Sequence, residues 1–69
     1  MRYTLLNKNK IREKFGEPVL YELMGLAKTW AATEPEVKQG DRVIMGRYEV
    51  EVTRLIYDVV NLALKKVDK

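Results

Sequence analysis

The chain has 69 residues, of which 46% are hydrophobic and 33% are charged, a composition typical of one small globular domain. It contains no His, Cys or Ser, which excludes histidine bases, thiolate nucleophiles, serine triads and most transition-metal sites. No apolar run approaches the length of a membrane span. We therefore expect a cytoplasmic protein that is not an enzyme and that has no cofactor, metal, membrane contact or small-molecule substrate.

The net charge of +3 is distributed unevenly along the chain. Residues 1–14 carry a net charge of +4, residues 15–51 a net charge of −3, and residues 52–69 a net charge of +2. Basic segments of this kind can neutralise phosphates and attract nucleic acid. They also keep a small domain soluble, so the charge pattern alone leaves both interpretations open.

The first predicted elements are a strand and a short helix. Residues 3–6 have the β-favouring, alternating character of a strand. Asn7 is a candidate N-cap for a helix over residues 8–15. Within that helix, Ile11 and Phe15 are four residues apart and share one face.

A second helix is predicted over residues 18–32. Gly16 suits the end of the preceding helix, and Pro18 suits the first turn of the next one. An apolar stripe runs along this helix and comprises Val19, Leu20, Leu23, Met24, Ala27, Trp30 and Ala31. A helix this apolar is either central in the fold or buried against a partner.

A loop, a hairpin and a third helix complete the predicted domain. Residues 33–41 are rich in charge and contain Pro and Gly, which predicts a loop. Residues 42–52 read as a hairpin whose turn contains Gly46. Residues 53–67 have the spacing of an amphipathic helix. The predicted fold class is α+β: a single small domain over residues 1–69 with a short N-terminal strand, two helices, a β-hairpin and a C-terminal amphipathic helix.

This order of elements resembles the excisionases and the related MerR-like winged helix-turn-helix family. The segments that carry the resemblance are "RYTL", "KFGEPVLYEL" and "VIMGRYEVEVTRLIYDVV". The resemblance implies that the second helix enters the major groove and that the hairpin is a wing. The wing tip would be Gly46-Arg47, with Arg42 at its base.

Two functions follow as hypotheses. The first is a DNA-binding accessory protein of a phage or mobile element, which binds duplex DNA without catalysis. Its candidate nucleic-acid-binding residues are Lys8, Lys10, Arg12, Lys14, Arg42 and Arg47.

The alternative is a phage-type interaction or assembly protein, either a head–tail joining protein or an inhibitor of a host protein. It would bind a protein partner or form a homo-oligomer, in the host cytoplasm or in the virion. Its apolar second helix would supply Tyr21, Met24 and Trp30 as anchors, because aromatic and Met side chains are enriched at interfaces.

Overall fold

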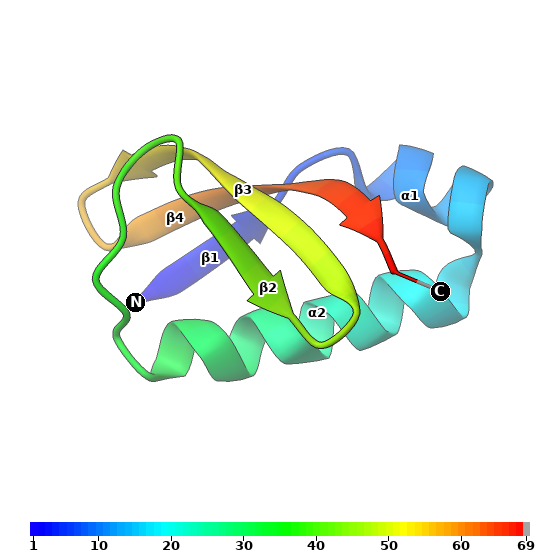
Figure 1. The fold of residues 1–69 in the computed structure, drawn as a ribbon, viewed down its shortest axis with the longest axis horizontal. Coiled ribbons are helices and arrows are strands. Elements are labelled where there is room, and N and C mark those ends of the chain that lie inside the picture. The colour runs from blue at the N-terminus through cyan, green and yellow to red at the C-terminus, as the bar shows by residue number, and fades with distance from the viewer. Residues whose placement is uncertain (69) are drawn as a thin grey trace.

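The computed structural model describes residues 1–68 and confirms the α+β fold class (Figure 1). A single four-stranded sheet has the strand order β1-β4-β3-β2, in which β1 pairs with β4 in parallel and the other neighbours are antiparallel. Neither helix in this part of the chain is long and apolar enough to cross a membrane. The elements in chain order are β1 (Arg2–Leu5), α1 (Lys8–Phe15), α2 (Glu17–Ala32), β2 (Arg42–Met45), β3 (Tyr48–Ile56) and β4 (Val59–Val67).

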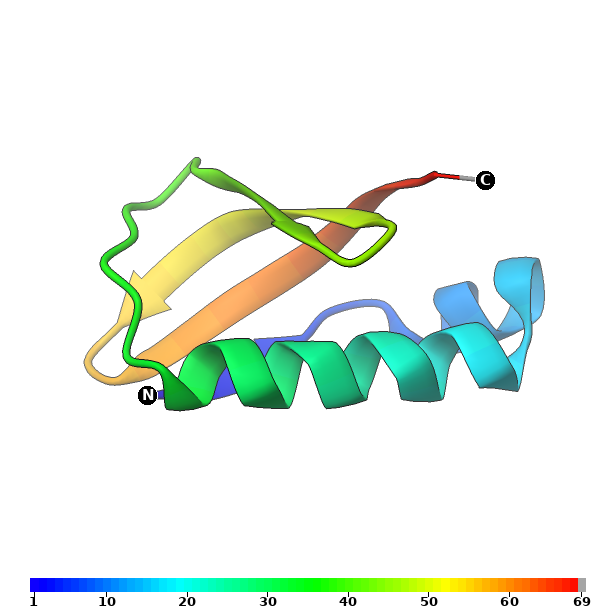
Figure 2. The same ribbon diagram turned by 60° about the horizontal axis from the view of Figure 1, so that its bottom comes forward.

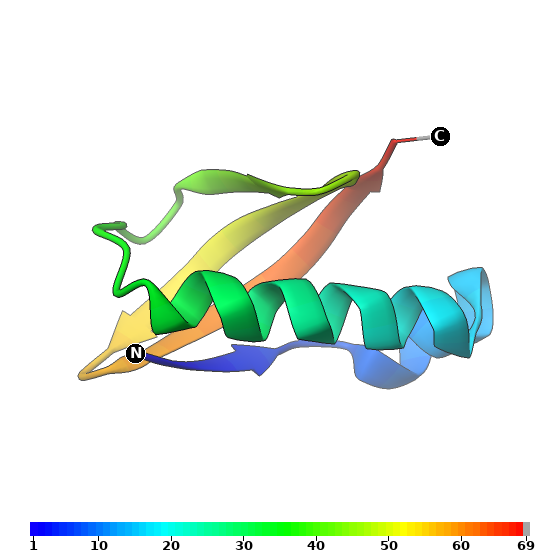
Figure 3. The same cartoon turned by 90° about the horizontal axis from the view of Figure 1, so that it is seen from below.

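The core lies between α2 and one face of the sheet (Figures 2 and 3). Four residues of α2, spaced three or four apart, are buried: Leu20, Leu23, Ala27 and Ala31. They meet alternate residues of the strands, which are also buried, including Tyr48, Val50, Val52, Val60 and Leu62. The apolar stripe predicted for the second helix is therefore the helix face that covers the sheet.

The predicted boundaries of the helices are close to those observed, and Asn7 occupies the predicted N-cap position of α1 but does not cap the helix with its side chain. Asn7 has a positive φ of 58°, and its side chain makes no capping hydrogen bond. An N-cap side chain acts from the β region of backbone conformation, which Asn7 does not occupy. Gly16 separates the helices with a φ of 93°, a conformation that glycine adopts most easily.

The predicted C-terminal helix over residues 53–67 is wrong. This segment forms the end of β3 and the whole of β4, joined at Tyr57 and Asp58. Its apolar residues fit helical spacing, but Val60 and Leu62 also alternate with less buried neighbours, which is the period of a strand. The turn contains no glycine that would have marked it in the sequence. Tyr57 takes the positive φ of 54° instead. Thr53, the first residue of the predicted helix, donates its hydroxyl to the Asn61 carbonyl at 3.2 Å.

The predicted hairpin and the predicted loop are both present. Strands β2 and β3 pair from Met45 and Tyr48 outward, across the two-residue turn Gly46-Arg47. Gly46 has a φ of 61°, and a Cβ there would lie 3.1 Å from the Leu26 side chain of α2. The hairpin tip therefore packs closely against α2. Residues 33–41 form neither helix nor strand.

Candidate functional site

A groove lies between α1 and the end of β4, which share one end of the molecule in Figure 1. We call it the lysine groove because both ends of the chain contribute lysines to it. Its volume is about 220 Å³. Its lining residues are Asn7, Lys10, Ile11, Lys14, Phe15, Leu64, Lys65 and Lys66.

The parallel pairing of β1 with β4 explains this convergence. Parallel strands run in the same direction, so β1 and β4 finish towards the same end of the sheet. Because α1 follows β1 directly, the last residues of β4 emerge beside α1. The two basic ends of the sequence are therefore brought together by the sheet topology.

Local geometry places the individual lysines in the groove. Lys10 and Lys14 are one turn apart and project from the same face of α1. In β4 the register shifts between Lys66, which pairs with Glu49, and Leu64, which pairs with Val50. The extra residue in this bulge is Lys65, and a bulge redirects neighbouring side chains. Lys65 and Lys66 are consequently both exposed and both line the groove.

The groove keeps a positive charge because its lysines are poorly neutralised. Within residues 1–68, no carboxylate oxygen lies within 4.0 Å of Nζ of Lys10 or Lys14. Lys65 lies 3.2 Å from Glu51, and Lys66 lies 3.9 Å from Asp68. Both pairs are partly exposed, where an ion pair is weak and an incoming anion can compete for the ammonium group.

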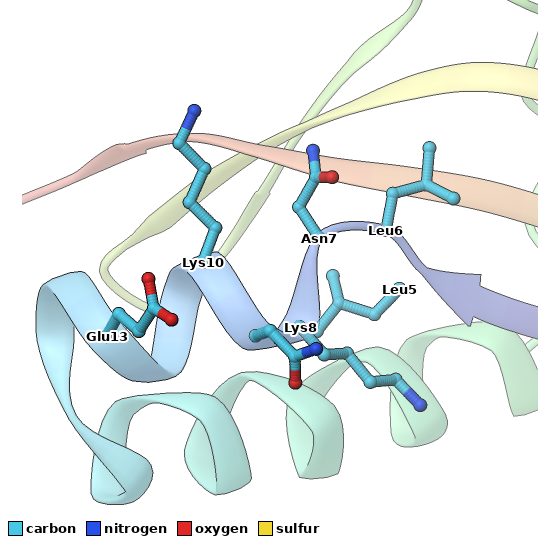
Figure 4. A pocket seen from close by; sticks show the side chains of 7 residues that line it. Leu5, Leu6, Asn7, Lys8, Lys10 and Glu13 are labelled. Atoms are coloured by element: carbon cyan, nitrogen blue, oxygen red, sulfur yellow. The ribbon is translucent and has the colours of Figure 1, made fainter.

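The other two basic residues of α1 lie outside the lysine groove. Arg12 donates to Oδ1 of Asn9 at 3.3 Å, and its Nε lies 3.5 Å from Glu17 of α2. Figure 4 shows Lys8 and Lys10 pointing in different directions from α1. The broad, open hollow in that view has a volume of about 810 Å³ and is lined by Leu5, Leu6, Asn7, Lys8, Asn9, Lys10 and Glu13. The four predicted basic residues of α1 thus do not form one site.

The two arginines predicted for the hairpin, Arg42 and Arg47, each have a carboxylate partner. Arg42 donates from Nη1 to Glu49 at 2.7 Å. Arg47 lies 3.3 Å from Glu22 of α2 and donates to the Tyr48 hydroxyl at 3.1 Å. Their positive charges are therefore offset within the chain.

Tyr48 and Glu22 join the hairpin tip to α2. The Tyr48 hydroxyl donates to Glu22, and this hydrogen bond lowers the pKa of the Glu22 carboxyl, with a further contribution from the Arg47 charge. Burial raises the pKa of Tyr48, and its hydrogen bond to Glu22 acts in the same direction. These contacts hold the tip of the hairpin against α2. They give Arg47 a structural role, because it bonds to both Glu22 and Tyr48.

The three predicted partner-binding residues of α2 differ in exposure. Tyr21 is 58% exposed. Met24 and Trp30 are half-buried and pack against the core. Moreover, α2 contains no Arg, Asn or Gln, the residue types best suited to bidentate base contacts in a major groove.

Of the eight residues that line the lysine groove, Lys10 and Lys14 were among the predicted sites and the other six were not. Lys65 and Lys66 were assigned to the end of a helix, and Phe15 was expected only to share an apolar face with Ile11. The net positive charge of the C-terminal segment was the one available signal for the lysines. In addition, residues 1–68 contain no group of three or more His, Cys, Asp and Glu that could hold a metal ion.

Comparison with known proteins assigns no family. No family model matches the chain, and neither the curated proteins nor the solved structures give a significant match. The resemblance to excisionases therefore stays a prediction, and the final helix that it implied is replaced by a strand.

Proposed function

We propose that this protein binds duplex DNA, without catalysing a reaction, through the lysine groove. The observation that carries the proposal is the convergence of Lys10, Lys14, Lys65 and Lys66 from opposite ends of the chain. Lysines that contact phosphates release condensed counterions, and this release drives association. The absence of a close carboxylate beside Lys10 and Lys14 within residues 1–68 leaves them available for such contacts.

The chemistry of the groove favours binding that depends little on DNA sequence. A lysine ammonium is a compact charge with three donors, which suits phosphate oxygens without selecting a base. The apolar face of α2 is buried in the core, and the helix contains no Arg, Asn or Gln that could form bidentate hydrogen bonds with base edges. We therefore expect similar affinities for duplexes of unrelated sequence.

Salt dependence provides the first test. If the four groove lysines each contact a phosphate, the slope of log K against log salt concentration should be about −3.6. The affinity for a short fluorescent duplex, followed by anisotropy, should then fall roughly 100-fold between about 50 and 200 mM NaCl. The absence of any binding at the lower salt concentration would contradict the proposal.

A matched pair of variants tests the location of the site. Lys10→Gln/Lys14→Gln and Lys28→Gln/Lys38→Gln each remove two positive charges, but Lys28 and Lys38 are exposed and lie outside the groove. The groove variant should lower the magnitude of the salt slope by about two and leave the control slope unaffected. Equal losses in the two variants would show that only the net charge matters.

A protein partner that docks on α2 is the second candidate. The observation in its favour is the exposure of Tyr21, a residue type enriched at interfaces. In the homo-oligomeric form of this hypothesis, sedimentation should reveal a self-associated species that Tyr21→Ala returns to the monomer. A wild-type chain that stays monomeric at high concentration would exclude the homo-oligomer hypothesis.

A further inference from the structure

Apolar side chains also line the lysine groove, and one of them is aromatic. Ile11 is buried and Leu64 is half-buried, whereas Phe15 remains 39% exposed. The Nζ atom of Lys14 lies 5.4 Å from the centre of the Phe15 ring. Phe15 is therefore a partly exposed ring in a groove that four lysines also line, although it belongs to the same helix face as the buried Ile11.

This combination matches a ligand with a planar ring joined to an anion. A nucleobase stacks on an aromatic side chain whatever its identity, because every base has a π face, while nearby cations hold the phosphates on either side. An aliphatic residue at position 15 would line the groove equally well but would offer no stacking surface. The ring suits a base and the lysines suit phosphates, and both groups occur in single-stranded nucleic acid.

We infer that one unpaired base stacks on Phe15 while its flanking phosphates contact Lys10, Lys65 and Lys66. The inference rests on one part of the proposed function, the binding of phosphates by the groove lysines, and does not require that the bound strand be paired. The groove volume of about 220 Å³ is below the roughly 300–1,000 Å³ of sites that enclose a drug-sized ligand, so it suits a single base. Paired bases are stacked inside a duplex and cannot reach the ring. Single strands should therefore bind more tightly than a blunt duplex of equal length.

The test compares two strands that differ only in their bases. One is oligothymidylate, and the other is an abasic strand with the same number of phosphates. Wild-type protein should bind oligothymidylate about ten-fold more tightly, a value within the range measured for stacking of one base on an aromatic side chain. Phe15→Leu should abolish this preference, measured as the ratio of the affinities of the variant for the two strands. Phe15→Trp should retain the preference, which controls for an effect of Phe15→Leu on folding.

The remaining outcomes separate this inference from the proposed function. Equal affinities of the wild-type protein for the two strands would overturn the stacking inference and leave phosphate binding intact. Binding of oligothymidylate without any binding of duplex would overturn the proposed duplex function and support the stacking inference. Failure to bind any of these nucleic acids would overturn both. Tighter binding of polyglutamate than of oligothymidylate would instead identify an acidic peptide as the ligand and would also overturn the inference.

Discussion

The lysine groove and the β2–β3 hairpin both expose basic side chains, but their charges differ in availability. In the hairpin, Arg42 and Arg47 lie 2.7 and 3.3 Å from carboxylates of the same chain. In the groove, Lys10 and Lys14 have no carboxylate within 4.0 Å among the described residues. A nearby carboxylate competes with phosphate for a basic side chain, so the surroundings of each basic residue matter as well as the number of basic residues.

The largest expected effect comes from the core, on which both regions depend. Leu23 is fully buried between α2 and the sheet. Replacing it with alanine should lower the free energy of unfolding by about 2–5 kcal/mol, because the lost packing leaves a cavity. Urea denaturation measures the change, with Tyr21→Ala on the exposed side of α2 as the control. A loss below about 1 kcal/mol for Leu23→Ala would show that α2 is not the main support of the sheet.

The second effect would make the hairpin resemble the groove. Glu22→Gln/Glu49→Gln removes the carboxylate partners of both hairpin arginines. Arg47 lines a small cavity together with Lys66, so the freed charges would extend the basic surface of the groove. We expect duplex affinity to rise by up to about ten-fold.

Glu34→Gln/Glu36→Gln is the matched control for this gain, because it changes the net charge equally in the loop that follows α2. If both double variants raise the duplex affinity by the same factor, the gain comes from net charge. The carboxylates beside the hairpin arginines then do not prevent the hairpin from binding DNA.

The third effect is a pH dependence of the contact between the hairpin tip and α2. The folded chain lowers the pKa of Glu22, so its contribution to stability is present above its unfolded pKa and is lost as the pH falls through the folded value. The folded chain raises the pKa of Tyr48, so that contribution is present below its unfolded pKa and is lost as the pH rises through the folded value.

Urea denaturation at a series of acidic and alkaline pH values measures both losses of stability. The acidic loss of stability should be smaller in Glu22→Gln than in the wild-type chain, and the other carboxylates cancel in the difference. Superimposable acid limbs for the two proteins would exclude Glu22 as a stabilising contact.

The smallest effect concerns a carboxylate beside the groove. Glu13 lies on α1 three residues after Lys10, and both line the hollow in Figure 4. Glu13→Gln should raise duplex affinity about two-fold, because it removes a nearby repulsion of phosphate. The remote Glu36→Gln serves as the control and should have no measurable effect in the same anisotropy assay. An unchanged affinity in Glu13→Gln would place the bound phosphates away from this side of α1.

The elements with strong local signals could be predicted from the sequence. Gly16 and Pro18 marked the junction of the helices, and Gly46 marked the hairpin turn. The final strand could not be recognised as easily, because the turn at Tyr57 lacks glycine and the flanking apolar residues satisfy both periodicities. The error concealed the second half of the candidate site.

The set of residues that line the lysine groove could not be predicted from local sequence patterns. It depends on the parallel pairing of β1 with β4, which are far apart in the sequence. The basic character of both chain ends was visible, whereas their adjacency was not. Likewise, the partners of Arg42 and Arg47 became visible only when the sheet register and the position of α2 were known.

Direct comparison of two charge-matched variants tests the central claim most directly. Lys10→Gln/Lys14→Gln and Arg42→Gln/Arg47→Gln remove the same net charge, one pair from the lysine groove and the other from the hairpin. With a single duplex at one moderate salt concentration, the groove variant should lose about ten-fold or more in affinity. The hairpin variant should lose less affinity than the groove variant, since Arg42 and Arg47 each lie within 3.3 Å of a carboxylate, whereas Lys10 and Lys14 have no carboxylate within 4.0 Å among residues 1–68. Equal losses, or a larger loss for the hairpin variant, would contradict the assignment of the site to the lysine groove.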